Sequence, residues 1–282
     1  MRYVKLNNGV EMPILGFGVF QLQDYKECKN AVLNAIESGY RLIDTAASYE
    51  NEKAVGDAIK ESGIDRKELF ITTKLWIQKD GYDGTKKAFN ESLEKLQIDY
   101  LDLYLIHQPF GDYYAEWRCM EELYSCGKIR AIGVSNFLED RLVDLIIHNN
   151  ITPAINQIEI NPFYQRVHYQ AIMKEYNVQP QGWAPFAEGK EGIFNDDILL
   201  TLAKKYNKSV AQIILNWIVR RNIITIPKST NIKRMKENIE IFDFQLEQED
   251  IQKISTLDKN KSVFFSHQDV EMVKFISQRE VK

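Results

Sequence analysis

Residues 41–49 read Arg-Leu-Ile-Asp-Thr-Ala-Ala-Ser-Tyr, a short apolar run that ends on an aspartate and continues into a polar loop. The preceding stretch, Lys26 to Ser38, has apolar residues at the spacing of an amphipathic helix. Another apolar, β-branched run follows at Leu69–Thr73. A short strand joined to the next strand by an amphipathic helix is the repeating unit of a parallel α/β sheet.

This unit recurs along the chain. Further helical patterns cover Thr85–Leu96 and Val210–Val219, and an N-terminal hairpin is predicted over Tyr3–Met12 with Asn8-Gly9 as its turn. Most intervals between strands are roughly 25–33 residues, the length of one strand–helix unit. The interval before the last strand is longer and must hold an extra turn or loop. The predicted core strands are Ile14–Gly18, Arg41–Asp44, Leu69–Thr73, Leu101–Ile106, Ile129–Val134, Ala154–Ile158, Gln179–Trp183 and Ile223–Ile226.

Eight such units predict an α/β protein with a (β/α)₈ TIM barrel and an N-terminal β-hairpin. An open, doubly wound sheet is the alternative, but Gly16-Phe17-Gly18 is followed by no third glycine at the spacing that such a sheet favours. No linker or composition change divides the chain, so residues 1–282 are expected to form one domain. In a TIM barrel the active site lies at the carboxyl ends of the strands.

Composition places the chain among ordinary globular proteins, with 44% hydrophobic and 27% charged residues. The net charge of -4 argues against nucleic acid and anionic membranes as partners, and no apolar run has the length of a signal peptide or membrane span. The cysteines Cys28, Cys119 and Cys126 are odd in number and show no zinc-site spacing. We expect a cytoplasmic protein without a metal, either a monomer or a weak homo-oligomer.

Four polar residues stand at or just after the ends of neighbouring predicted strands: Asp44, Tyr49, Lys74 and His107. Each has an ordinary interpretation by itself, as a helix cap, a loop aromatic, a surface charge or a core histidine. These interpretations fit less well when all four residues are placed on one face of a barrel. We therefore expect the four side chains to converge on one site.

The chemistry of such a group is specific. A tyrosine hydroxyl has an ordinary pKa of about 10, and a nearby ammonium lowers it. An aspartate would position the lysine and keep it charged, and a histidine could donate a hydrogen bond to a carbonyl oxygen. Since no side chain supplies hydride, reduction of that carbonyl would need a nicotinamide cofactor.

Several motifs with these residues follow one another along the chain. They are Gly16-Phe17-Gly18, Leu42-Ile43-Asp44-Thr45-Ala46, Tyr49-Glu50-Asn51-Glu52, Thr73-Lys74-Leu75-Trp76, Asp99-Tyr100-Leu101-Asp102-Leu103, Leu105-Ile106-His107, Gly127-Lys128-Ile129-Arg130, Gly133-Val134-Ser135-Asn136-Phe137, Asn156-Gln157-Ile158-Glu159 and Ile226-Pro227-Lys228-Ser229. In this order the chain resembles the aldo-keto reductase superfamily from end to end, and most of all its bacterial diketogluconate reductase and glyoxal reductase members. The resemblance implies Tyr49 as general acid, Lys74 and Asp44 as the pair that tunes it, and His107 as the residue that orients the carbonyl.

The resemblance also implies an NADPH site without a Rossmann domain. It assigns the nicotinamide carboxamide to Ser135, Asn136 and Gln157, and the face of the nicotinamide ring to Trp183, where many members have tyrosine. Without the resemblance, Trp183 could equally be a barrel-core aromatic.

A basic segment follows the last predicted strand. Such a segment before a helix is often only solvated, but the resemblance makes it the clamp for the adenosine 2′-phosphate, hence NADPH rather than NADH. The clamp would comprise Lys228, Ser229, Thr230 and Arg234, with Glu237 and Asn238 against the adenine.

The substrate pocket is expected beside the catalytic positions, lined by Phe20, Trp76, Phe110 and His107. Gln108 stands where many members have tryptophan, which favours hydrophilic substrates. The short region after Leu257 leaves little chain for a long specificity loop. We expect small aldehydes, dicarbonyls and sugar-derived carbonyls as substrates.

Two other functions remain open. Potassium-channel β subunits resemble this fold and bind NADPH chiefly as a sensor, although no added N-terminal inactivation segment is present here. A sugar-phosphate isomerase or another barrel enzyme could use the basic segment for a phosphate, but this would leave the four strand-end residues unexplained.

Overall fold

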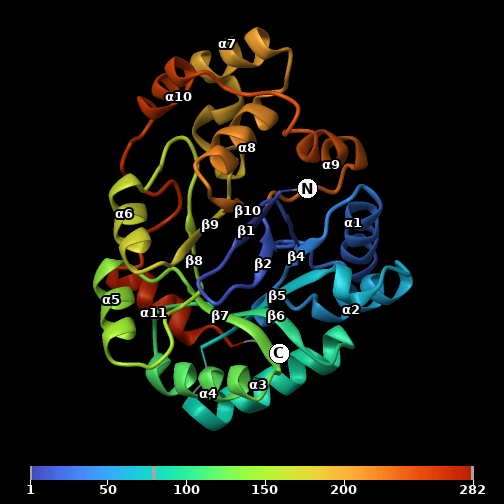
Figure 1. Ribbon diagram of the computed structural model, residues 1–282, viewed down its shortest axis with the longest axis vertical. Coiled ribbons are helices and arrows are strands. Elements are labelled where there is room, and N and C mark those ends of the chain that lie inside the picture. The colour runs from blue at the N-terminus through green and yellow to red at the C-terminus, as the bar shows by residue number, and fades with distance from the viewer. Residues whose placement is uncertain (1, 78–80, 281–282) are drawn as a thin grey trace.

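The computed structural model describes residues 2–77 and 81–280. A ring of helices surrounds a central barrel of parallel strands (Figure 1). The predicted (β/α)₈ fold is confirmed, and so is the N-terminal hairpin, in which β1 (Tyr3–Lys5) pairs antiparallel with β2 (Glu11–Pro13). The predicted turn contains Gly9 at a φ of 86°, a left-handed conformation that glycine adopts without steric cost.

Each core strand is hydrogen-bonded in parallel to its neighbour in the chain, from β3 through β10. The two ends of this sheet also meet, because Gly16 N donates to Thr225 O at 2.9 Å and Thr225 N donates to Ile14 O at 3.0 Å. These bonds close the barrel. The strands are β3 (Phe17–Gly18), β4 (Leu42–Asp44), β5 (Phe70–Leu75), β6 (Leu101–Ile106), β7 (Ile129–Ser135), β8 (Ile155–Glu159), β9 (Gln179–Trp183) and β10 (Ile224–Thr225).

The three stretches predicted to be amphipathic, Lys26–Ser38, Thr85–Leu96 and Val210–Val219, form helices. The long interval before β10 holds an irregular turn, η3 (Ala187–Asn195), and an additional helix, α7. The α-helices are α1 (Tyr25–Glu37), α2 (Glu52–Glu61), α3 (Gly81–Leu96), α4 (Tyr113–Ser125), α5 (Glu139–Ile147), α6 (Val167–Glu175), α7 (Asp197–Tyr206), α8 (Val210–Arg220), α9 (Ile232–Ile239), α10 (Gln248–Ser255) and α11 (Val270–Gln278). Two short 3₁₀ turns are η1 (Ala47–Tyr49) and η2 (Arg66–Glu68).

Helix α8 shows how local sequence sets these elements. Ser209 and Gln212 form a capping box at its start, so two backbone donors of the first turn have side-chain acceptors. Nearly every side chain of the helix is buried, which agrees with its apolar sequence.

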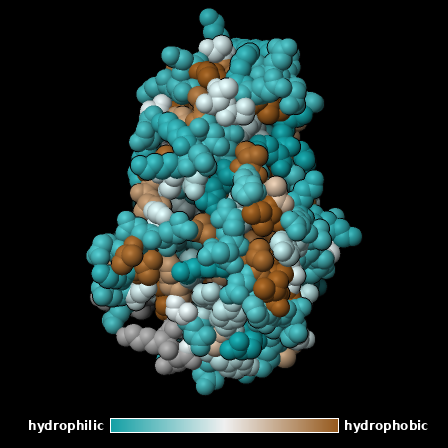
Figure 2. Space-filling model, turned by 90° about the vertical axis from the view of Figure 1, so that its left-hand side faces the viewer, coloured by the Kyte–Doolittle hydropathy of each residue, from teal (hydrophilic) through white to brown (hydrophobic). Residues whose placement is uncertain are grey.

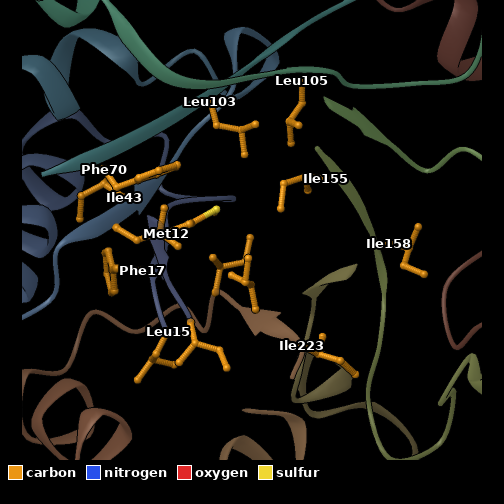
Figure 3. Packing of buried hydrophobic residues seen from close by; sticks show 14 of the residues in the cluster. Met12, Leu15, Phe17, Ile43, Phe70, Leu103, Leu105, Ile155, Ile158 and Ile223 are labelled. Atoms are coloured by element: carbon orange, nitrogen blue, oxygen red, sulfur yellow. The ribbon is translucent and has the colours of Figure 1, made fainter. Parts of the chain in front are cut away.

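Apolar side chains fill the barrel (Figure 3). Met12 of the hairpin is fully buried in the same cluster as Phe17, Ile43 and Leu103 of the strands, so the hairpin contributes to the barrel core. The described helices include none that is long and apolar enough to cross a membrane. On the face shown in Figure 2, hydrophobic side chains lie in small groups among hydrophilic ones.

Candidate active site

The barrel brings the four strand-end residues together. Asp44 ends β4, Lys74 lies near the end of β5, and His107 follows β6 directly. Tyr49 ends the 3₁₀ turn η1, which follows β4. Because neighbouring parallel strands end at the same edge, one turn and three strand ends are sufficient to assemble this group.

The ammonium group of Lys74 is the centre of the group. Its Nζ lies 2.5 Å from Asp44 Oδ1, 2.9 Å from the carbonyl oxygen of Thr45 and 3.2 Å from the hydroxyl of Tyr49. An ammonium has three hydrogens to donate, and these three acceptors use all of them. The side chain of Lys74 has no solvent exposure, so its direction toward Tyr49 is fixed by these bonds.

Asp44 is held from a second side. Its other carboxylate oxygen accepts a hydrogen bond of 2.7 Å from Nε2 of Gln157 on β8. Burial raises the pKa of Asp44, against the opposing effect of Lys74 and Gln157. Burial also lowers the pKa of Lys74, but the charges of Asp44 and Tyr49 more than offset burial, so that pKa lies above its ordinary value.

Tyr49 keeps its proton in this environment. Burial raises the pKa of its hydroxyl, and Lys74 lowers it without cancelling the effect of burial. Lys74 therefore lowers the pKa of Tyr49 as expected, but burial has the larger effect, and the pKa lies above its ordinary value. A phenol that is protonated at neutral pH is the form that a general acid requires.

His107 lies between two aromatic rings. Its ring centroid is 5.6 Å from that of Tyr49 and 5.3 Å from that of Trp76, and both rings are nearly perpendicular to it. Burial lowers the pKa of His107 well below its ordinary value, and Lys74 and Arg279 act in the same direction. The imidazole is therefore neutral at neutral pH. Its Nδ1 lies 3.1 Å from the hydroxyl of Ser48.

The residues expected around a nicotinamide lie together at the ends of β7, β8 and β9. Asn136 has a left-handed backbone with φ of 62°, and its amide donates to the carbonyl oxygen of His107 at 3.0 Å. The indole of Trp183 donates to Asn136 Oδ1 at 2.9 Å, and Ser135 Oγ donates to the carbonyl oxygen of Gln157 at 2.9 Å. Through Gln157, this group contacts the Asp44–Lys74 pair directly.

The basic segment follows β10 and enters α9. The side chains of Lys228, Thr230 and Arg234 are exposed, that of Ser229 is partly buried, and the side chain of Asn231 caps the helix by accepting from Lys233 N and Arg234 N. Two backbone donors of the first turn of α9 are therefore already paired within the protein. The two expected adenine contacts follow on α9: Glu237 is partly buried and Asn238 is buried.

The aromatic residues expected around a substrate lie at the barrel mouth. Phe20 stacks at a tilt on Tyr49, with ring centroids 5.0 Å apart. Trp76 and Phe110 belong to one apolar cluster with Ile276 of α11. Oε1 of Gln108 lies 3.0 Å from Nε2 of His267, and because an amide oxygen can only accept, the imidazole is the donor.

The C-terminal segment, which includes α11, contacts residues at the barrel mouth. The indole of Trp76 donates to the carbonyl oxygen of Arg279 at 2.8 Å, and the Arg279 guanidinium donates to Ser48 O at 3.3 Å. Ser262 and Val263 donate to the buried carboxylate of Glu159 at the end of β8. In Figure 1 this segment descends from α10 to α11 on the side of the barrel where α5 and α6 lie. The short region after Leu257 therefore contacts the barrel mouth through Arg279 and the end of β8 through Ser262 and Val263.

A cavity of about 570 Å³ lies under this segment. Asn136 and Trp183 line it from the barrel, and Phe264, Phe265 and His267 line it from the C-terminal segment. The residues that sequence reasoning did not find include Ser48, Phe264, Phe265, His267 and Arg279. The part of the chain that the structure describes contains no cluster of His, Cys, Asp and Glu side chains suited to a metal ion.

The fold and the group of polar residues at the strand ends define a barrel oxidoreductase of the aldo-keto reductase type. The sequence matches the Aldo/keto reductase family over residues 14–259, and the chain belongs to this family. The chain is 49% identical to the glyoxal reductase of Bacillus subtilis (strain 168) over 261 residues, which cover 92% of this chain and 94% of that protein. The predicted resemblance to the glyoxal reductase type is thereby confirmed.

Two solved structures are similar over nearly their full length. One is an aldo-keto reductase from a Medee basin deep-sea metagenome library, with a TM-score of 0.92 and 41% identity over 95% of this chain and 99% of that chain. The other is the Bombyx mori aldo-keto reductase in complex with NADP, with a TM-score of 0.89 and 38% identity over 97% of this chain and 96% of that chain.

The position of His267 predicts a pH dependence of stability. Burial lowers the pKa of this imidazole to about 4, from an ordinary value of 6.5, with Arg166 and Arg141 acting in the same direction. Between these two values the unfolded chain binds a proton that the folded chain does not, so stability falls as the pH is lowered through this range. Urea unfolding should show that His267 makes the protein about 2 kcal/mol less stable at pH 5 than at pH 7.

The variant His267→Gln should lose this part of the pH dependence, and His168→Gln, which alters an exposed histidine, should keep it. An identical difference between pH 7 and pH 5 in wild type and His267→Gln would contradict the assignment.

Proposed function

We propose that this protein reduces small aldehydes and ketones to alcohols with NADPH, and that Tyr49 is the general acid. The observation that carries the proposal is the position of the Tyr49 hydroxyl, 3.2 Å from a fully buried ammonium that is itself paired with Asp44 at 2.5 Å. Such an arrangement supports proton donation by a phenol, because the ammonium stabilises the phenolate that forms.

The chemistry of the site residues suits an NADPH cofactor. Ser135, Asn136 and Gln157 carry the hydroxyl and amide groups that a carboxamide can pair with, and Trp183 offers an aromatic face beside them. Lys228 and Arg234 place two exposed cations after the last strand, where a phosphomonoester could bind. When bound, NADPH would supply the hydride.

The remaining steps belong to the protein. His107 is neutral and can donate one hydrogen bond to the carbonyl oxygen, which orients the carbonyl and polarises it. When negative charge develops on the carbonyl oxygen during reduction, the Tyr49 hydroxyl would transfer its proton to that oxygen. The product is an alcohol, and the remaining phenolate is stabilised by the Lys74 ammonium until Tyr49 is protonated again from solvent.

The substrate class follows from the mouth of the barrel and from the relative. Phe20, Trp76 and Phe110 provide apolar contact, and the pair of Gln108 and His267 provides a polar one. The C-terminal segment contacts Trp76 through the carbonyl oxygen of Arg279. Because the Bacillus subtilis relative is a glyoxal reductase, we favour small aldehydes, dicarbonyls and sugar-derived carbonyls as substrates.

Removal of the Tyr49 hydroxyl tests the proposal. Tyr49→Phe should lower kcat for a dicarbonyl such as glyoxal by about 10²–10⁴-fold, since general acid catalysis typically contributes this factor. The dissociation constant for NADPH should be unchanged, because the proton moves in the transition state and not on binding. The measurements are NADPH absorbance during turnover and fluorescence titration with NADPH.

The matched control is Tyr104→Phe, which removes the hydroxyl of another buried tyrosine, one that packs against Phe89. Its kcat should equal that of the wild type. If Tyr49→Phe keeps more than about a tenth of the wild-type kcat, Tyr49 is not the proton donor. If the wild type binds NADPH but reduces no member of a carbonyl panel, the sensor alternative is supported instead.

Cofactor choice gives a second test. Arg234→Ala should weaken NADPH binding by about 1.5–3 kcal/mol, the value of one charge-assisted hydrogen bond, and should leave NADH binding nearly unchanged. The control Lys236→Ala removes a neighbouring exposed cation on α9 that we assign to no contact, and it should change neither affinity. Equal weakening of NADPH and NADH by Arg234→Ala would show that Arg234 does not contact the 2′-phosphate.

A further inference from the structure

Ser48 is a buried residue next to Tyr49 in the 3₁₀ turn η1, with 3% of its surface exposed. Its hydroxyl oxygen lies 3.1 Å from Nδ1 of His107, at hydrogen-bond distance. No motif in the sequence distinguishes Ser48 from the residues around it, and Ser48 has no role in the proton transfer described above.

The direction of this hydrogen bond follows from counting hydrogens. A serine hydroxyl has one hydrogen to donate, and within residues 2–77 and 81–280 the hydroxyl of Ser48 has His107 Nδ1 as its partner. If Nδ1 carried a hydrogen and donated it, the buried serine hydrogen would be left without an acceptor, which is unfavourable. The hydroxyl of Ser48 is therefore the donor and Nδ1 is the acceptor.

A neutral imidazole carries a hydrogen on only one of its two nitrogens. Burial and the nearby Lys74 and Arg279 keep the His107 ring neutral. When Nδ1 accepts a hydrogen bond, the hydrogen of the ring must be on Nε2. The perpendicular rings of Tyr49 and Trp76 restrict rotation of the imidazole out of this position.

We infer that Ser48 is a positioning residue, whose hydroxyl holds His107 in the tautomer with its hydrogen on Nε2, ready to donate to a carbonyl oxygen. The inference rests on the proposed function for His107. Two functional residues then lie next to each other in one short turn. Tyr49 donates the proton, and Ser48 keeps the hydrogen of His107 on Nε2. Backbone bonds from Tyr49 N to Ala46 O at 3.0 Å and from Glu50 N to Ala47 O at 3.2 Å hold that turn.

The tautomer can be observed directly by ¹⁵N NMR of the full chain labelled on histidine, with and without NADPH. The chain has 4 histidines, so the signals of His107 can be assigned by their loss in His107→Asn. In the wild type at neutral pH, Nδ1 should show the shift of an unprotonated nitrogen and Nε2 that of a protonated one. In Ser48→Ala the Nδ1 signal should move because its donor is lost, and the two tautomers should mix.

Kinetics provide the second arm. Ser48→Ala should lower kcat for carbonyl reduction by about 3- to 10-fold, the factor for one neutral hydrogen bond, with an unchanged dissociation constant for NADPH. Ser48→Thr and Ser48→Val have similar shapes, but only threonine keeps a hydroxyl. Ser48→Thr should keep both the wild-type tautomer and the wild-type kcat, and Ser48→Val should keep neither. Ser92→Ala, which alters an equally buried serine on α3, should leave kcat unchanged.

A hydrogen on Nδ1 in the wild type, or an unchanged Nδ1 signal in both Ser48→Ala and Ser48→Val, would overturn the inference. So would a kcat of these two variants equal to that of the wild type. If the wild type itself reduces no carbonyl, the proposed function fails, and the NMR arm still decides whether Ser48 sets the tautomer of His107.

Discussion

Lys74 carries a charge at the barrel mouth, on a side chain that is fully buried. An isolated ammonium in such a place is strongly unfavourable, and removing one partner of a buried ion pair typically costs about 3–5 kcal/mol. Its three hydrogen bonds therefore have to be present together, to Asp44, to Thr45 O and to Tyr49. These bonds connect the end of β4, the turn that follows it and β5.

The same requirement extends across the barrel. Asp44 also accepts from Gln157 on β8, and the carbonyl oxygen of Gln157 accepts from Ser135 on β7. Strands on both sides of the mouth are thus connected through one carboxylate, which is possible because the sheet closes on itself between residues 14–16 and Thr225. The catalytic residues and those expected around the nicotinamide form one hydrogen-bonded unit, so a change in the lysine pair should affect both.

Much of this arrangement could be predicted from sequence, since strand ends in a parallel barrel converge and Asp44, Lys74 and His107 stand at or next to three of them. The bond between Gln157 and Asp44 could not be predicted, because it joins residues 113 positions apart. The C-terminal contacts of His267 and Arg279 come from a segment outside the strand–helix repeat, so no periodicity indicates where it lies. The net upward shift in the pKa of Tyr49 also depends on burial, which the order of residues does not give.

The central claim is that Lys74 and Tyr49 act as one proton-donating unit. A double-mutant cycle on kcat with NADPH and glyoxal, using Tyr49→Phe, Lys74→Met and the combination, tests it most directly. If the claim is correct, the double variant should be little slower than the slower single variant, because removing either residue disables the unit. Two independent losses that multiply in the double variant would contradict it.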